Sequence, residues 1–175
     1  PNTFDLLMIN IQLNNSTNIK THNVFAGDKH EKVDFLLNTV NSGGSKRKPK
    51  KSNFLYEYDN PETIQLDSVP LDEYLGDEQF DLILIDIEGS EYFAMKGMKE
   101  ILSNCKTLVV EFLPHHLKNV AGISVEQFVS VLPKHFKNFH LPNNNQTHEF
   151  SKTSEVLQKL YDSNLGEDGI IFTSK

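Results

Sequence analysis

The sequence lacks any uninterrupted run of about 18 apolar residues, so no segment is expected to span a membrane. Its single cysteine, Cys105, excludes a framework of internal disulfides and suits a reducing compartment. No secretory signal-peptide pattern is found at its start, and we therefore expect a cytoplasmic protein. The 24 acidic side chains outnumber the 17 basic ones, and this balance argues against nucleic acid as the main partner.

The length and composition predict one globular domain over residues 1–175, because 175 residues with 38% hydrophobic side chains can bury a sizeable core. Apolar spacing predicts the elements. Helices are expected at 3–14, 92–102, 123–136 and 153–162, with a helical turn closing 62–75. Strands are expected at 18–27, 32–38, the start of 62–75, 82–85, 107–114, 138–142 and 168–175. The alternation of strands and helices in the second half predicts an α/β sheet.

Residues 41–53, NSGGSKRKPKKSN, contain no apolar side chain and include a run of basic residues from Lys46 to Lys51. We interpret this segment as a solvated surface loop. The alternative is a phosphate-binding or localisation patch.

Acidic residues follow a continuous apolar run, LILI at 82–85. Such a run is typical of a strand that is buried on both faces in a parallel sheet covered by helices. Asp86 and Glu88 come directly after it, and Glu111 lies at the end of the next strand. Ligands of open parallel sheets bind at the carboxyl ends of the strands, so these acids are predicted to line a binding rim if the two strands are neighbours.

Carboxylates gathered at one rim repel each other, and desolvation adds to the cost. A cation would relieve this cost, whether a metal, a basic side chain or a cationic ligand. Because Asp86 follows four apolar residues, we expect it to be at least partly buried. A metal site formed by Asp86, Glu88, Glu111 and His115 is conceivable, but the ligand spacing is not tight and no metal is predicted.

The residues around the acids have simpler interpretations. Gly89 fits a tight strand-to-helix turn, and Ser90 is a candidate cap of the helix that follows. Glu91 would favour the amino end of that helix through the helix dipole. His115 and His116 lie just beyond Glu111, and each is either a general base or a surface histidine without a role.

The segment IDIEGSEYFAMKG, residues 85–97, resembles the hallmark of the FkbM-type methyltransferases, a branch of the class I S-adenosylmethionine-dependent enzymes. Other segments resemble parts of that family in the same order, namely PNTFDLLMINIQLNN, NVFAGDKHEKVDF, NSGGS, IQLDSVPLDEYL, LVVEFLP and EDGIIFTSK. The resemblance implies a Rossmann-like class I methyltransferase sheet of seven strands. In this fold helices cover both faces of the sheet, and the last strand is antiparallel.

The resemblance also implies a function, which is methyl transfer from S-adenosylmethionine to a hydroxyl of a small molecule or sugar. It implies that the donor is bound at the rim and by the loop that starts at residue 41. The expected cofactor-binding residues are Asp86, Glu88, Glu111, Asn41, Ser42 and Gly43. Asp86, Glu88 and His115 are the candidates for the catalytic base, and the sequence does not rank them.

Three parts of the family pattern are not found in this sequence: the first strand, its Gly-rich turn and the acidic end of the second strand. We therefore expect an N-terminally truncated domain, whose exposed strand edges are covered by rearrangement or by another chain, such as a second copy. Two other functions stay open. One is a non-catalytic remnant of the fold that acts as an association module, and the other is a metal-dependent hydrolase that uses the carboxylate rim.

Overall fold

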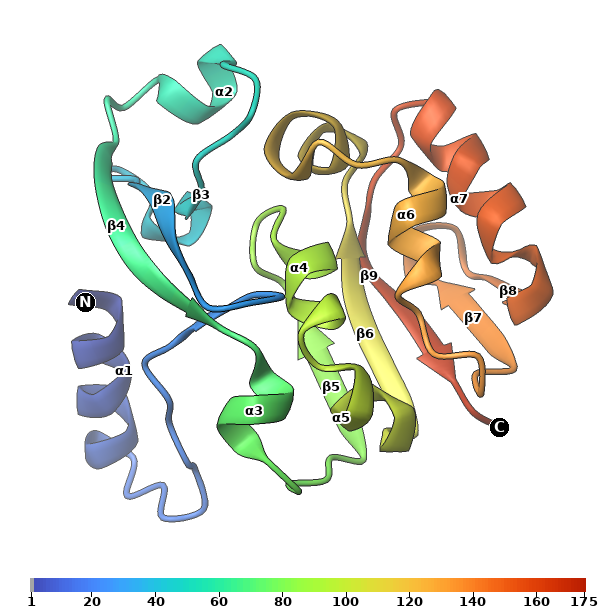
Figure 1. Cartoon of the computed structure of the whole chain (residues 1–175), viewed down its shortest axis with the longest axis horizontal. Coiled ribbons are helices and arrows are strands. Elements are labelled where there is room, and N and C mark those ends of the chain that lie inside the picture. Colours follow the sequence, from blue (N-terminus) through green and yellow to red (C-terminus); the bar gives the residue numbers. More distant parts are fainter. Residues whose placement is uncertain (1) are drawn as a thin grey trace.

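The computed structural model describes residues 2–175, which form two β-sheets accompanied by short helices (Figure 1). The first sheet has the order β1-β4-β2-β3. Its strands are β1 (Phe25–Ala26), β2 (Glu31–Leu37), β3 (Lys46–Arg47) and β4 (Glu62–Val69). β1 is parallel to β4, whereas β2 is antiparallel to both β3 and β4.

The second sheet has the order β5-β6-β9-β7-β8. Its strands are β5 (Leu82–Ile85), β6 (Thr107–Phe112), β7 (Asn138–Leu141), β8 (Gln146–Glu149) and β9 (Glu167–Thr173). β5 and β6 are parallel neighbours, which confirms the pairing that the predicted rim requires. The other three pairings are antiparallel, as expected for the last strand, β9. β5, β6 and β7 therefore run in one direction, with β9 and β8 opposite to them. The described residues form two sheets, so the expectation of one seven-stranded sheet is wrong.

The helices are α1 (Asn2–Leu13), α2 (Phe54–Glu57), α3 (Leu71–Leu75), α4 (Glu91–Lys96), α5 (Lys99–Asn104), α6 (Val125–Ser130) and α7 (Thr153–Asp162). Short 3₁₀ turns lie at Ser42–Gly44, Pro142–Asn144 and Phe150–Lys152, and a π-helical segment at His116–Ala121. Among residues 2–175, no helix is both long and apolar enough to cross a membrane.

Local sequence explains where most of these elements end. α1 stops before Asn15, which has φ +52°, and Ser124 caps the start of α6 through a capping box with Gln127. The predicted helix 123–136 is too long, because α6 ends ahead of Pro133, which disfavours a helix at the residue before it. The predicted helix 92–102 is interrupted between α4 and α5. The predicted strand 18–27 is reduced to β1, and the polar strand β8 carries no apolar pattern that predicts it.

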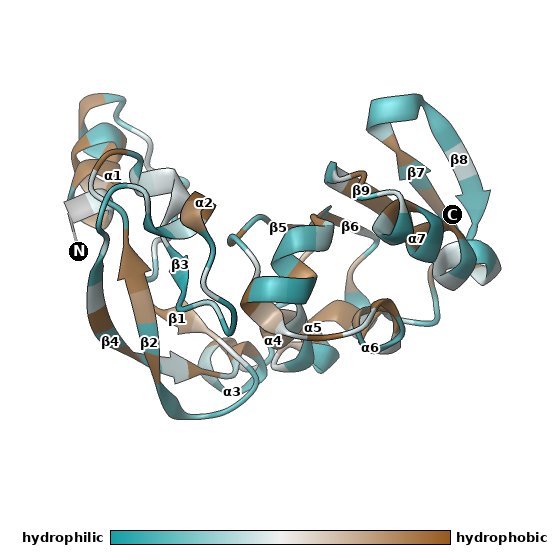
Figure 2. Ribbon diagram, turned by 90° about the horizontal axis from the view of Figure 1, so that it is seen from above, coloured by the Kyte–Doolittle hydropathy of each residue, from teal (hydrophilic) through white to brown (hydrophobic). Residues whose placement is uncertain are grey.

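The main core lies between the second sheet and one layer of helices. Figure 1 shows α4, α5, α6 and α7 in front of this sheet, and Figure 2 shows α4, α5 and α6 on the same side of β5 and β6. Alternate side chains of β6 and β9 are fully buried against these helices, namely Leu108, Val110, Phe112, Ile170 and Phe172. On the opposite face, Leu82 and Leu84 are 57% and 66% exposed. The expectations of a doubly buried strand at 82–85 and of helices on both faces are therefore wrong for this structure.

The first sheet is joined to α4 and α5 by polar contacts. The Lys96 Nζ lies 2.8 Å from Asp28 Oδ2, and the Asp72 backbone N–H donates to the Gly97 carbonyl at 3.0 Å. The Asp72 carboxylate accepts from the first free N–H groups of α5, those of Glu100 and Ile101. These contacts tie the strands of the first sheet to the helices that follow β5.

The one-sided core predicts unequal effects for two leucines of neighbouring strands. Leu108→Ala removes a fully buried side chain and should lower the free energy of unfolding by about 2–5 kcal/mol. Leu84→Ala removes a mostly exposed one and should change it by less than about 1 kcal/mol. Urea titration of both variants measures the difference. A large loss for Leu84→Ala would mean that this face is covered in solution.

Candidate functional site

The turn after β5 is held by a buried carboxylate rather than by a helix cap. Glu91 is 3% exposed, and its Oε1 accepts from the backbone N–H of Ile87 at 3.1 Å and of Gly89 at 3.0 Å. Burial raises the pKa of the Glu91 carboxyl. Glu91 thus closes the turn, which is more than the expected interaction with the helix dipole. Ser90 makes no side-chain cap, and its buried Oγ has no hydrogen-bond partner in residues 2–175.

The backbone of this turn is left-handed at Glu88 (φ +57°) and Gly89 (φ +94°). The tight turn predicted at Gly89 is confirmed, and a side chain there would also meet Val120, with 2.8 Å between the two Cβ atoms. A left-handed non-glycine residue costs free energy and is often found at functional sites. In this case the turn directs the Glu88 carboxylate to the rim beside β6.

A basic side chain from the first sheet meets the acids. The Lys46 Nζ lies 2.7 Å from Glu88 Oε2 and 5.1 Å from the centre of the Tyr56 ring. Lys46 is only 6% exposed, whereas the Glu88 side chain is 27% exposed. The interpretation of 41–53 as a solvated loop is therefore wrong at Lys46, which supplies one cation that the acid rim requires.

His116 links Lys46 to Glu111. Its Nε2 lies 3.4 Å from Lys46 Nζ, and its Nδ1 lies 3.3 Å from Glu111 Oε2. Burial and the Lys46 charge lower the pKa of the imidazole, which is therefore neutral near pH 7. An ammonium group only donates hydrogen bonds, so Nε2 must accept and Nδ1 must carry the proton that is donated to Glu111. The expectation that His116 is a surface histidine is wrong, because it is 2% exposed.

Glu111 is buried beside other carboxylates. Burial first, and then the charges of Asp86 and Glu88, raise the pKa of its carboxyl from 4.5 to about 7, while the Lys46 charge opposes this shift. The predicted gathering of carboxylates at one rim is therefore present in the structure.

His115 lies on the other side of Lys46, next to Tyr56. The Tyr56 hydroxyl lies 2.9 Å from His115 Nδ1, and it also reaches the His115 carbonyl at 3.3 Å. Burial first, and then repulsion from His116 when that ring is protonated and from Lys46, lower the pKa of the His115 imidazole to about 4. His115 is thus a neutral ring at pH 7, oriented through one nitrogen.

The structure brings Glu88, Glu111 and His115 together around Lys46, but it leaves other predicted residues apart. Asp86 belongs to the same rim, yet it is exposed, so the expectation of partial burial is wrong. Asn41, Ser42 and Gly43 are exposed as well, and no hydrogen bond among the described residues joins them to the rim. Ser42 instead lines a separate cavity beside α1.

Sequence reasoning missed Lys46, Tyr56 and the buried state of His116. Lys46 is one of several basic residues in its run, and no feature of the sequence distinguishes it from the others as a site residue. Tyr56 lies in the four-residue helix α2, which has no pattern that points to a site. The structure also shows no group of three or more His, Cys, Asp or Glu side chains in residues 2–175 that could hold a metal ion.

The turn predicts a clear difference between two left-handed glycines. Gly89→Ala adds both backbone strain and a collision with Val120, whereas Gly76→Ala adds strain alone, because no atom lies within 4 Å of the new methyl group. We expect Gly89→Ala to lower the free energy of unfolding by about 1–3 kcal/mol more than Gly76→Ala does. Denaturant titration measures both, and equal losses would show that the turn has room for a side chain.

Comparison with known proteins shows to which family this chain belongs. A crystal structure of a methyltransferase FkbM from Methylobacillus flagellatus KT is 17% identical, with a TM-score of 0.48, and the match covers 97% of this chain and 33% of that one. This chain thus spans about a third of the length of that protein. A search among curated proteins finds no match. The family model described as the methyltransferase FkbM domain matches residues 1–163. Because that model covers most of the sequence, the chain belongs to the FkbM methyltransferase domain family.

Proposed function

We propose that this chain takes part in methyl transfer from S-adenosylmethionine to a hydroxyl group of a small molecule or sugar. The observation that carries the proposal is the negative charge gathered at the rim by Asp86, Glu88 and Glu111, of which Glu88 is paired with Lys46 at 2.7 Å. Burial and the charges of Asp86 and Glu88 together raise the pKa of the Glu111 carboxyl to about 7. A cationic ligand beside Asp86 and Glu88 would relieve this charge, so the residues present fit a sulfonium group. Family membership supplies methyl transfer as the reaction class.

The proposal takes the second sheet as part of a Rossmann-like class I methyltransferase fold. Two features support this: the parallel pair β5–β6, whose carboxyl ends form the rim, and the antiparallel strand β9 beside β6. Ligands of open α/β sheets bind at such a rim. A metal-dependent hydrolase is not favoured, because the acids of residues 2–175 form no metal-binding group.

The residues of the rim have distinct roles in this proposal. S-adenosylmethionine supplies an electrophilic methyl group, which an acceptor oxygen takes in an in-line displacement. The protein therefore acts mainly by positioning and by excluding water. Asp86 and Glu88 hold the cationic end of the donor, and Lys46 fixes the Glu88 carboxylate at 2.7 Å. The buried His116 contacts Lys46 at 3.4 Å and Glu111 at 3.3 Å and so holds Lys46 beside Glu88.

We assign to His115 the removal of the hydroxyl proton from the methyl acceptor. The His115 ring is neutral at pH 7. The Tyr56 hydroxyl donates its proton to the His115 carbonyl and so accepts from Nδ1–H, which leaves the Nε2 lone pair as the proton acceptor. Glu88 is less suitable because Lys46 already engages its carboxylate. A pKa of about 4 makes His115 a weak base, which suffices where the base only removes a proton that the attacking oxygen is losing.

Donor binding by the Asp86 variant tests the proposal. Asp86 is exposed and forms no hydrogen bond or ion pair with residues 2–175, so Asp86→Asn should leave the fold intact. We expect calorimetry to show S-adenosylmethionine binding by the wild type, weakened about tenfold in this variant by the loss of one charge. Asp77→Asn, at another exposed acid, is the matched control and should bind normally. Absent binding, or equal affinities of both variants and the wild type, would contradict the proposal.

A further inference from the structure

The basic run after Lys46 has no role in the reaction proposed above. We propose that a pocket beside the rim, formed around Arg47 and Lys50, binds an anionic group carried by the methyl acceptor, either a phosphate monoester or a carboxylate. This inference rests on the proposed function for the identity of the ligand as the acceptor. The pocket itself is argued from its own residues.

The pocket has a volume of about 350 Å³ and lies between β2, the residues after β3 and the π-helical segment. Its basic lining side chains include Arg47, Lys48 and Lys50, and Val120 forms one wall. The same Val120 packs against the Gly89 turn, so the pocket and the rim share a wall. A molecule whose hydroxyl reaches the rim is therefore within reach of the pocket.

The charge of the pocket is opposite to that of the chain. Four basic side chains line it, against the two acids Glu31 and Asp34, although the chain carries a net charge of −7. Lys32 is paired with Asp67 at 2.9 Å, outside the pocket. Within the described residues 2–175, by contrast, Lys48 and Lys50 form no salt bridge. Lys50 thus adds a positive charge without an ion-pair partner among residues 2–175 to the pocket of a protein that has an excess of acids.

Arg47 is held in place, but its hydrogen-bonding groups are not satisfied. Its guanidinium lies 4.3 Å from the ring centre of Phe93 and 5.6 Å from that of Phe25. Its contact with Glu31 is long, at 3.6 Å between Nη1 and Oε1, and Glu31 also holds Lys29 at 3.0 Å. The buried Nε and Nη2 atoms have no acceptor among residues 2–175. Because these two atoms are covered by the protein, the guanidinium acts on an anion in the pocket mainly through its charge, which one long ion pair compensates only weakly.

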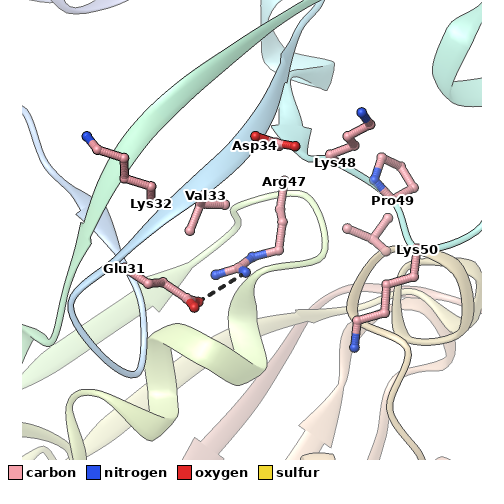
Figure 3. Close-up of a pocket in the computed structure, with 9 residues that line it drawn as sticks. Glu31, Lys32, Val33, Asp34, Arg47, Lys48, Pro49 and Lys50 are labelled. Carbon is pink, nitrogen blue, oxygen red and sulfur yellow. Dashed lines mark ion pairs between the residues drawn. The ribbon is translucent and has the colours of Figure 1, made fainter.

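Lys50 is the second basic residue that faces the pocket. Figure 3 shows Arg47 and Lys50 extending to the same side, whereas Lys32 and Lys48 turn away. The Lys50 side chain passes so close to Gly122 that a Cβ there would lie 2.6 Å from Lys50 Cδ. The Lys51 backbone N–H donates to the Asn119 carbonyl at 3.1 Å, which ties the segment to the π-helical turn. Lys50 thus packs along Gly122 but stays exposed, as expected for a surface loop.

Titration of the protein with simple anions tests this inference without the methyl donor. Inorganic phosphate and acetate are added at constant ionic strength, with chloride as the reference, while amide shifts are followed by NMR. We expect saturable shifts at residues 47–50 and 120–122. Lys50→Gln should weaken binding about tenfold, as for the loss of one charge-assisted hydrogen bond. Lys134→Gln, an exposed lysine elsewhere on the surface, is the matched control and should not weaken it.

Tighter binding of phosphate assigns a phosphate monoester, and tighter binding of acetate assigns a carboxylate. Shifts that do not exceed those with chloride, or equal weakening by Lys50→Gln and Lys134→Gln, would overturn the inference. Because no donor is present, its failure is distinct from failure of the proposed methyl transfer, which the calorimetry with Asp86→Asn tests.

Discussion

Replacing Lys46 by methionine is expected to lower the free energy of unfolding by about 2–4 kcal/mol. The variant leaves the Glu88 carboxylate without its 2.7 Å partner, and removing one member of a largely buried pair is costly. It also removes the positive charge that lowers the pKa of His116, so that pKa should rise. Urea denaturation measures the stability, and NMR titration of the imidazole protons measures the pKa.

A matched control uses a lysine of the same sheet. Lys32→Met breaks an ion pair with Asp67 in which both side chains are largely exposed, and it should change the stability by less than about 0.5 kcal/mol. The double variant Lys46→Met/Glu88→Gln removes both charges and should recover most of the loss. If Lys46→Met is no more destabilising than Lys32→Met, or if the His116 pKa does not move, Lys46 is not the centre of the site.

The wild type is expected to lose stability as the pH rises. Glu111→Gln should not show this loss. The folded protein keeps the Glu111 proton up to about pH 7, whereas an unfolded chain loses it near 4.5. Between these values the folded state binds more protons, so its stability falls with rising pH. The shift corresponds to at most about 3 kcal/mol, a cost that is complete above pH 7.

The measurement is the free energy of unfolding of both proteins from pH 4 to pH 8.5. The depressed pKa of His115 acts in the opposite direction, because its neutral ring is favoured on folding and stability is lost as the pH falls from 6.5 towards 4. His115 is present in both proteins, so its effect cancels in the difference between the two curves, which reports Glu111 together with its influence on the Glu91 pKa. A constant difference across this range would contradict the raised pKa of Glu111.

The sequence predicts the rim well because its signals are local. The apolar run at 82–85 predicts a strand, and the acids after it and at Glu111 meet once β5 and β6 pair in parallel. The tight turn at Gly89 is predicted correctly for the same reason, since a turn between a strand and a helix depends on few residues. Capping at Ser124 and the end of α1 near Asn15 follow from equally local rules.

The contacts that were missed depend on distant parts of the chain. Lys46 and Glu88 are 42 residues apart, and Tyr56 and His115 are 59 apart, so no local pattern predicts either contact. The exposure of Leu84 and Asp86 was missed because a continuous apolar run does not show which faces of its strand are covered. The loop at Asn41 was expected at the rim only through the family resemblance, and its contacts in this structure lie elsewhere.

The central claim is that the methyl donor binds at the carboxylate rim, and photochemical labelling tests it most directly. The protein is irradiated with S-adenosylmethionine labelled in its methyl group, and the labelled peptides are identified by mass spectrometry. We predict saturable labelling of peptides that contain residues 86–91 or 111–116, reduced by Asp86→Asn and unchanged by Asp77→Asn. Saturable labelling confined to other peptides, or none at all, would contradict the account.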